Sequence, residues 1–174
     1  MPTELIQRIN AIIPFPLLRT EYGDHHAQPD LYSPVSPEII AAAEGDLRFR
    51  LPPLLVQCYT EIGNGGFGPG HGLIGLESED GDAFRHDLTD ACLAELYTAY
   101  REEALRRPWP KGLLPLFLKG DGAMDCIQAT KPPYLVAHLK DDATLDRTTE
   151  PFEAYLQTWA EAMETRGRDL GLLR

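Results

Sequence analysis

Three residues in the second half of the chain could form a nucleophilic site. Asp125 and Cys126 are adjacent, and His138 follows in the next predicted strand. A cysteine nucleophile needs a nearby histidine to take its proton and an environment that lowers the thiol pKa. Neighbouring residues of a strand point to opposite faces, so Cys126 is expected on the face opposite Asp125. The sequence therefore favours a buried strand cysteine over a cysteine-dependent enzyme, which stays the weaker alternative.

A run of acidic residues between positions 77 and 90 is the second group that could do chemistry. Arg85 is the one basic side chain among six acids. Their spacing does not follow the D-x-[DN]-x-[DN]-G pattern of an EF-hand, so we assign no metal ligands. Two interpretations remain open, a solvated acidic loop and a docking surface for a basic partner. The acids are Glu77, Glu79, Asp80, Asp82, Asp87 and Asp90.

Glycines crowd the segment 63–75, which reads G-N-G-G-F-G-P-G-H-G-L-I-G. It contains two matches to G-x-G-x-x-G, but a dinucleotide site needs a strand before the glycines and a helix after them. Here a helix is predicted before the segment and a strand after it, so we assign no cofactor. Glycine is needed where the backbone takes positive φ or packs closely, and the segment is therefore a specified backbone path. Phe67 within it either anchors a partner or packs back on the helix.

The composition limits the classes of partner. The chain has 174 residues, 43% of them hydrophobic, which suits one folded domain. Its formal charge of −11 argues against nucleic-acid binding and permits a basic protein partner. The three cysteines follow no C-x-x-C spacing, and no histidine pattern indicates a metal site. No apolar run is long enough to span a membrane and no secretory signal is apparent, so we expect a cytoplasmic protein.

The elements that position these residues follow from the spacing of apolar side chains. Helical spacing predicts helices over 5–13, 36–45, 51–62 and 93–104, and a last helix that begins at Thr149 and Glu150. Short apolar runs bounded by glycine or proline predict strands over 73–76, 113–118, 124–129 and 134–139. The last three are expected to form an antiparallel meander. The predicted fold is a single α+β domain, with a mainly antiparallel sheet flanked by N-terminal and C-terminal helices.

One combination of motifs resembles a known family. The helix that begins at Leu51-Pro52 and runs into Gly63-Asn64-Gly65-Gly66, followed by the glycine-rich segment, resembles the hallmark of the SUKH superfamily. A weaker match is Leu114-Pro115-Leu116 with Gly120-Asp121-Gly122 and Asp125-Cys126-Ile127. The resemblance covers about residues 36–165 of a single domain taken as 1–174. One departure is the turn at 119–122, where many relatives carry a tryptophan and a cysteine near the glycines.

The resemblance implies a non-enzymatic binding domain without catalytic residues. The superfamily joins bacterial immunity proteins of polymorphic toxin systems with a fungal regulator of cell-wall synthesis. The first hypothesis is an immunity protein whose acidic surface blocks the basic groove of a cognate toxin, often a nuclease in this family. The second is a scaffold or regulatory module without a toxin partner. The predicted partner surface consists of Phe67, Glu77, Glu79, Asp80 and Asp82.

Overall fold

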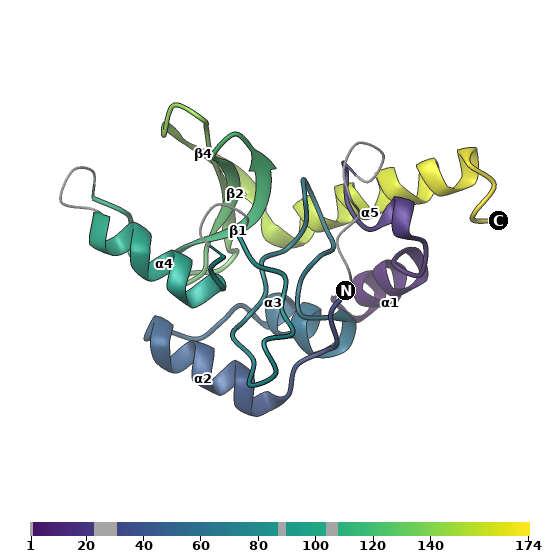
Figure 1. Cartoon of the computed structure of the whole chain (residues 1–174). Helices are drawn as coiled ribbons and strands as arrows, with labels where there is room; N and C mark the ends of the chain where they lie inside the picture. The colour runs from purple at the N-terminus through teal and green to yellow at the C-terminus, as the bar shows by residue number, and fades with distance from the viewer. Residues whose placement is uncertain (1, 23–30, 87–89, 104–107) are drawn as a thin grey trace.

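Four strands in the second half of the chain pair in sequence order. The computed structural model describes residues 2–22, 31–86, 90–103 and 108–174 (Figure 1). Its sheet has the order β1-β2-β3-β4, and every pair is antiparallel. The strands are β1 (Leu113–Gly120), β2 (Ala123–Gln128), β3 (Leu135–Leu139) and β4 (Leu145–Pro151). The predicted antiparallel meander is confirmed and gains a fourth strand.

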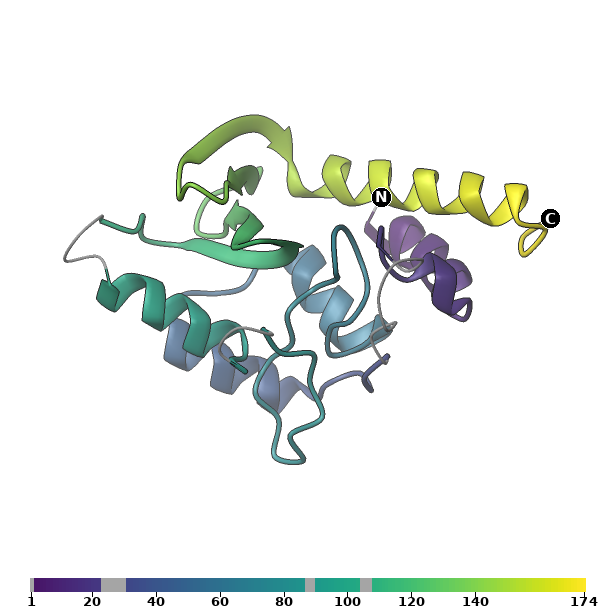
Figure 2. The same cartoon turned by 45° about the horizontal axis from the view of Figure 1, so that its top comes forward.

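Helices precede and follow the sheet, so the chain is a single α+β domain, as predicted. Before the sheet lie α1 (Pro2–Ile12), the short 3-10 helix η1 (Pro16–Leu18), α2 (Pro37–Leu47), α3 (Pro53–Gln57), the π-helical turn η2 (Cys58–Ile62) and α4 (Leu93–Glu102). After it lies α5 (Phe152–Asp169). The first and last helices, α1 and α5, run side by side, and Arg8 pairs with Glu164 across them at 2.6 Å (Figures 1 and 2).

The two faces of the sheet are covered by different helices. Phe117 of β1 lies opposite Asp125 in the register and packs against Phe152 and Tyr155 of α5. The other face carries Met124, which the hydroxyl of Tyr100 in α4 approaches. Within the described residues, α4 reaches only part of that face, and a hollow remains between its end and the β3–β4 hairpin.

One predicted helix end and one predicted strand in the first half of the chain are wrong. Gly45 does not end the second helix, because α2 continues to Leu47, whose side chain is buried, and Arg48 takes the left-handed conformation instead (φ 62°). The strand predicted over 73–76 is not formed. Leu73 makes an isolated bridge to Phe117, and Ile74 donates its N–H to Leu116 O at 2.9 Å. The N–H of Leu73 donates to Phe67 O, and the N–H of Gly75 donates to Phe84 O, so no ladder with β1 develops.

The C-terminal part departs from the prediction at Thr149 and Glu150. Both residues belong to β4 and not to the helix start, which lies at Phe152. The helix predicted over 93–104 is present as α4, whereas Ala104 lies outside the described residues. None of the helices in the described part of the chain combines the length and the apolar character needed to cross a bilayer.

Candidate protein-binding site

Asn64 connects the glycine segment to the acidic segment. Its buried side-chain amide donates to Leu76 O at 2.9 Å and to Asp82 O at 3.0 Å, and its side-chain oxygen accepts from Leu76 N at 2.7 Å. Leu76 and Asp82 stand at the two ends of the acidic loop 77–82. One side chain therefore closes the base of that loop, and this is the structural role of the N-G-G turn.

Glycine is required beside Asn64 for a steric reason. Gly65 has a φ of 95°, and a Cβ on it would lie 2.5 Å from Leu73 O. A Cβ on Gly75 would lie 2.5 Å from Asn64 O. The two backbone segments approach too closely for any side chain at these positions. The dense glycines thus bring the strand-like segment after 73 against the turn at 64, which fixes where the acidic loop begins.

Phe67 does not form part of an exposed surface. Its side chain is 1% exposed and belongs to the hydrophobic core. The prediction that Phe67 anchors a partner is therefore wrong, and the alternative, in which it packs inward and closes the loop, is correct. Gly68 beside it also packs on the core, because a Cβ there would lie 2.7 Å from the ring of Phe117.

The acidic loop forms one wall of a groove. Glu79, Asp80 and Asp82 line a hollow of about 400 Å³ together with Glu38, the second residue of α2. We call these four residues and the hollow the acidic groove. Its other lining residues are polar or apolar but uncharged: Ser33, Pro34, Val35, Ser36, Ile39 and Ser78.

Both walls of the acidic groove are fixed to the same part of the backbone. The N–H of Asn64 donates to Tyr32 O at 3.1 Å, and the N–H of Val35 donates to Tyr59 O at 2.9 Å. The wall at 33–36 is thus attached next to the residue that closes the acidic loop. Both walls are therefore held through the backbone at Tyr59 and Asn64, and the groove keeps its shape without a direct contact between the walls.

The carboxylates of the acidic groove are accessible to a partner. Glu79, Asp80 and Asp82 are exposed, and none of them has an ion-pair partner within the described residues. A hydrogen bond from the Ser36 hydroxyl holds the pKa of Glu38 below its ordinary value. A hollow lined by four carboxylates without a cation of its own is suited to a cationic partner.

Glu77 takes a different role from the other predicted acids. It does not line the acidic groove, and its carboxylate lies 4.0 Å from the guanidinium of Arg85, which is also 4.0 Å from Glu95. Glu95 in turn accepts the N–H of Cys92 and caps α4. A metal ion could be reached by three side chains here, those of Glu77, Cys92 and Glu95. The guanidinium of Arg85 already neutralises the two carboxylates, and burial raises the pKa of Cys92 to about 11.

The two remaining acids of the run 77–90 do not contribute to the acidic groove as described. Asp90 is not among the lining residues of the groove, and Asp87 lies outside the described residues.

A buried polar cluster lies on the sheet face that α5 covers. Asp125 is 4% exposed, and its carboxylate binds His138 Nδ1 at 2.6 Å, Lys119 Nζ at 3.3 Å and the hydroxyl of Tyr155. Lys119 also pairs with Glu21 at 2.9 Å. Asp125 and His138 meet because they are direct partners in the register of β2 and β3. The sequence singled out both residues but not their partners, which come from β1 and α5.

This cluster does not include Cys126. Cys126 is fully buried on the opposite face, where its register partner is Ala137, and burial raises the pKa of its thiol. A nucleophilic cysteine needs the reverse, a lowered pKa and a histidine within hydrogen-bond reach. The Asp125 cluster instead joins β1, β2, β3, α5 and, through Glu21, the segment before α2. Glu21 also accepts the N–H of Gly70 at 2.7 Å, so the cluster fixes the glycine segment to the sheet.

Comparison with known proteins supports the resemblance seen in the sequence. The family described as SMI1 / KNR4 family (SUKH-1) matches residues 34–158, a range that holds the four carboxylates of the acidic groove, the N-G-G turn and the whole sheet. A comparison with curated proteins finds no significant match. Since the matched range spans well over half of the sequence, the chain belongs to the SMI1 / KNR4 family (SUKH-1).

Proposed function

We propose that this chain is a non-enzymatic protein-binding domain that acts in the cytoplasm as an immunity protein. Its partner is a toxin with a basic surface, most simply a nuclease whose substrate groove is lined by lysine and arginine. The acidic groove binds that surface and blocks access of the nucleic acid. Family membership supports the binding role, and the toxin partner is the specific part of the proposal.

The observation that carries the proposal is the unpaired charge of the acidic groove. Four carboxylates face one hollow, and no lysine, arginine or histidine is among its described lining residues. Like charges held together on a fixed backbone repel one another, and a cationic partner relieves that repulsion. The overall charge of −11 adds long-range attraction for the same partner.

The first test is co-expression with the product of the neighbouring open reading frame. We expect that product alone to stop growth, and this chain to restore growth and to co-purify with it. A harmless or non-binding neighbour would remove the support for immunity and would favour a scaffold or regulatory module.

A charge variant tests the binding surface. Replacing Glu79→Gln, Asp80→Asn and Asp82→Asn together removes three exposed charges without touching the core. We expect association with the toxin to slow by about tenfold at low salt and its salt dependence to become shallower. The matched control removes three exposed acids elsewhere, through Asp46→Asn, Asp121→Asn and Asp169→Asn. Equal rates for the two variants would show that total charge, and not the acidic groove, attracts the partner.

A further inference from the structure

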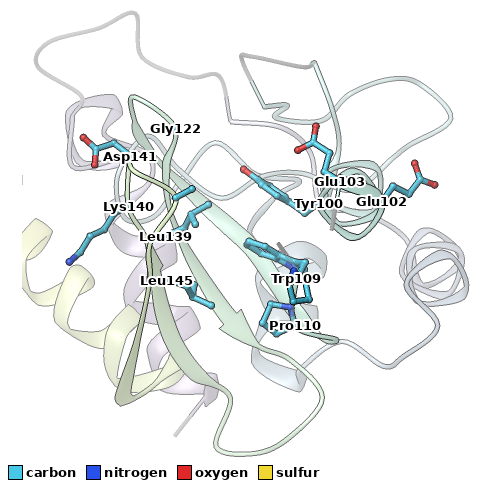
Figure 3. A pocket seen from close by; sticks show the side chains of 12 residues that line it. Tyr100, Glu102, Glu103, Trp109, Pro110, Gly122, Leu139, Lys140, Asp141 and Leu145 are labelled. Carbon is cyan, nitrogen blue, oxygen red and sulfur yellow. The ribbon is translucent and has the colours of Figure 1, made fainter. Parts of the chain in front are cut away.

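A second groove lies on the sheet face that α4 leaves partly uncovered. It has a volume of about 780 Å³ and runs between the end of α4 and the β3–β4 hairpin (Figure 3). Tyr100 and Trp109 form one side, and Leu139 and Leu145 form the other. We call this hollow the aromatic groove. No described residue lines both this groove and the acidic groove.

The aromatic side of the groove is rigid. The rings of Tyr100 and Trp109 stack with centroids 4.5 Å apart and an interplanar angle of 20°. The indole N–H of Trp109 donates to Leu113 O at 2.8 Å, which fixes the orientation of that ring. In the described part of the chain, the Tyr100 hydroxyl reaches the sulfur of Met124 alone, at 3.9 Å, so it keeps hydrogen-bonding capacity for another group. Rigid aromatic rings with a polar tip are typical of surfaces that hold an anchor side chain of a partner.

The opposite side of the groove is aliphatic because of the sheet register. Leu139 pairs with Met124 on one side and with Leu145 on the other, so the three side chains share one face. Leu145 belongs to the edge strand β4, is half-buried, and points toward Trp109 in Figure 3. An edge strand gains little from an apolar residue facing solvent, whereas a bound apolar side chain would complete the burial of Leu145.

The rim of the aromatic groove is acidic. Glu102, Glu103 and Asp141 are exposed, and none of them has an ion-pair partner in the described ranges. The one basic residue among the described lining is Lys140, which pairs with Asp146 at 2.5 Å and points away from Trp109 (Figure 3). Among the described lining residues, the groove therefore combines an apolar floor with three acids and one paired lysine.

We propose that the aromatic groove binds a peptide segment that carries a bulky apolar side chain flanked by lysine or arginine. The apolar side chain packs between the Tyr100–Trp109 pair and the leucines of the hairpin. The flanking cations approach Glu102 and Glu103 on one rim and Asp141 on the other. This binding mode does not depend on the acidic groove or on a toxin partner, and it can be tested with a synthetic peptide.

The two tryptophans make the test specific. Trp109 lines the groove although it is only 9% exposed, whereas Trp159 lies in α5 outside the groove lining and is 3% exposed, so their indole N–H signals in a ¹⁵N-labelled protein report on two separate places. The probe is an acetylated, amidated hexapeptide with the sequence Lys-Lys-Leu-Phe-Lys-Lys. We expect it to shift the Trp109 signal in a saturable manner and to leave the Trp159 signal in place.

Two control peptides separate the apolar from the charged contribution. Replacing Leu-Phe by Ala-Ala is expected to weaken binding by about tenfold or more, because the anchor is lost. Replacing the lysines by glutamine is expected to weaken it by about threefold or more. No Trp109 shift with the probe, or equal binding of the probe and either control, would overturn the proposal.

Protein variants locate the contact. The double variant Glu102→Gln and Glu103→Gln changes only exposed side chains and is expected to weaken binding of the probe by about threefold. The variant of the acidic groove, Glu79→Gln with Asp80→Asn and Asp82→Asn, is expected to bind the probe as the unmodified chain does. If only the second variant loses binding, the peptide occupies the acidic groove and the present proposal is wrong.

Discussion

The side chain of Asn64 and the backbone of Leu76 are bonded in both directions. The amide donates to Leu76 O at 2.9 Å, and the amide oxygen accepts from Leu76 N at 2.7 Å. This pairing imitates the hydrogen bonding of two backbone strands, so a single side chain substitutes for a strand partner. A third bond to Asp82 O makes Asn64 the residue that holds the acidic loop closed.

Removing this side chain should therefore be costly. Asn64→Ala leaves one N–H and two carbonyl groups without their partners at the base of the loop, and we expect the free energy of unfolding to fall by about 3 kcal/mol. Asn10→Ala is the matched control, because the other asparagine of the chain is exposed and its side chain donates a long hydrogen bond, at 3.5 Å, to Glu61 O. We expect that change to cost less than about 0.5 kcal/mol. Urea denaturation of both variants checks the difference, and equal losses would refute the role of Asn64.

Two glycines with positive φ should respond differently to the same substitution. Gly65 has a φ of 95° and faces Leu73 O, whereas Gly81 has a φ of 68° and a Cβ on it would meet nothing within 4 Å. Gly81→Ala should cost about 1 kcal/mol, which is the penalty of the left-handed conformation alone. Gly65→Ala adds a backbone clash and should cost at least about 2 kcal/mol more. Thermal unfolding of the two variants measures this, and similar midpoints would show that the glycine segment shifts freely.

Tyr155 should make stability depend on pH on the alkaline side. Burial, and then the nearby Asp125, raises the pKa of its hydroxyl well above the ordinary value. The folded state therefore retains a proton that the unfolded chain releases near pH 10, so this stabilisation is complete below about pH 10 and is lost as the pH rises further. In Tyr155→Phe we expect lower stability at pH 8, through the lost hydrogen bond, but a shallower decline between about pH 10 and 12.

The control for this prediction is Tyr22→Phe, which leaves the Asp125 cluster intact. Chemical denaturation at a series of pH values compares the slopes of the two variants. If both decline as steeply as the unmodified chain, the alkaline loss of stability has another source, such as the buried Tyr59, whose pKa burial also raises.

The sequence predicted the helices and the first three strands because their apolar residues repeat at clear intervals. It missed β4, whose residues Leu145–Pro151 read L-D-R-T-T-E-P. An edge strand with one neighbour and an exposed surface needs few apolar residues, so its pattern is weak. The same weakness led Thr149 and Glu150 to be interpreted as a helix start.

For the candidate sites too, the sequence indicated some residues, whereas the fold was needed to identify their partners. The acidic loop was visible as a run of charge, but Glu38 could not be assigned to it, because only the fold brings α2 beside residue 79. The pairing of Asp125 with His138 follows from the register of two predicted strands, whereas Tyr155 and Lys119 come from separate elements. The sequence gives a weak indication of the aromatic groove in the tryptophan that stands between two prolines at 108–110. The other side of the groove depends on β4, the strand that the sequence did not predict.

The last prediction concerns the three thiols and the weaker alternative of a cysteine-dependent enzyme. Burial raises the pKa of Cys58 to about 12 and that of Cys92 to about 11, and it raises the pKa of Cys126 as well. Because the thiolate is the reactive form, we expect all three to react with iodoacetamide at pH 8 far more slowly than free cysteine does. Cys92, with the smallest increase, should react first. Mass spectrometry after timed labelling locates the modified residues, and unfolding in guanidinium chloride should make all three reactive, which serves as the control. Rapid labelling of Cys126 in the folded chain would mean that its strand opens to solvent and that its thiolate is stabilised. The burial described for β2 predicts neither, so that result would return a thiol-based reaction to consideration.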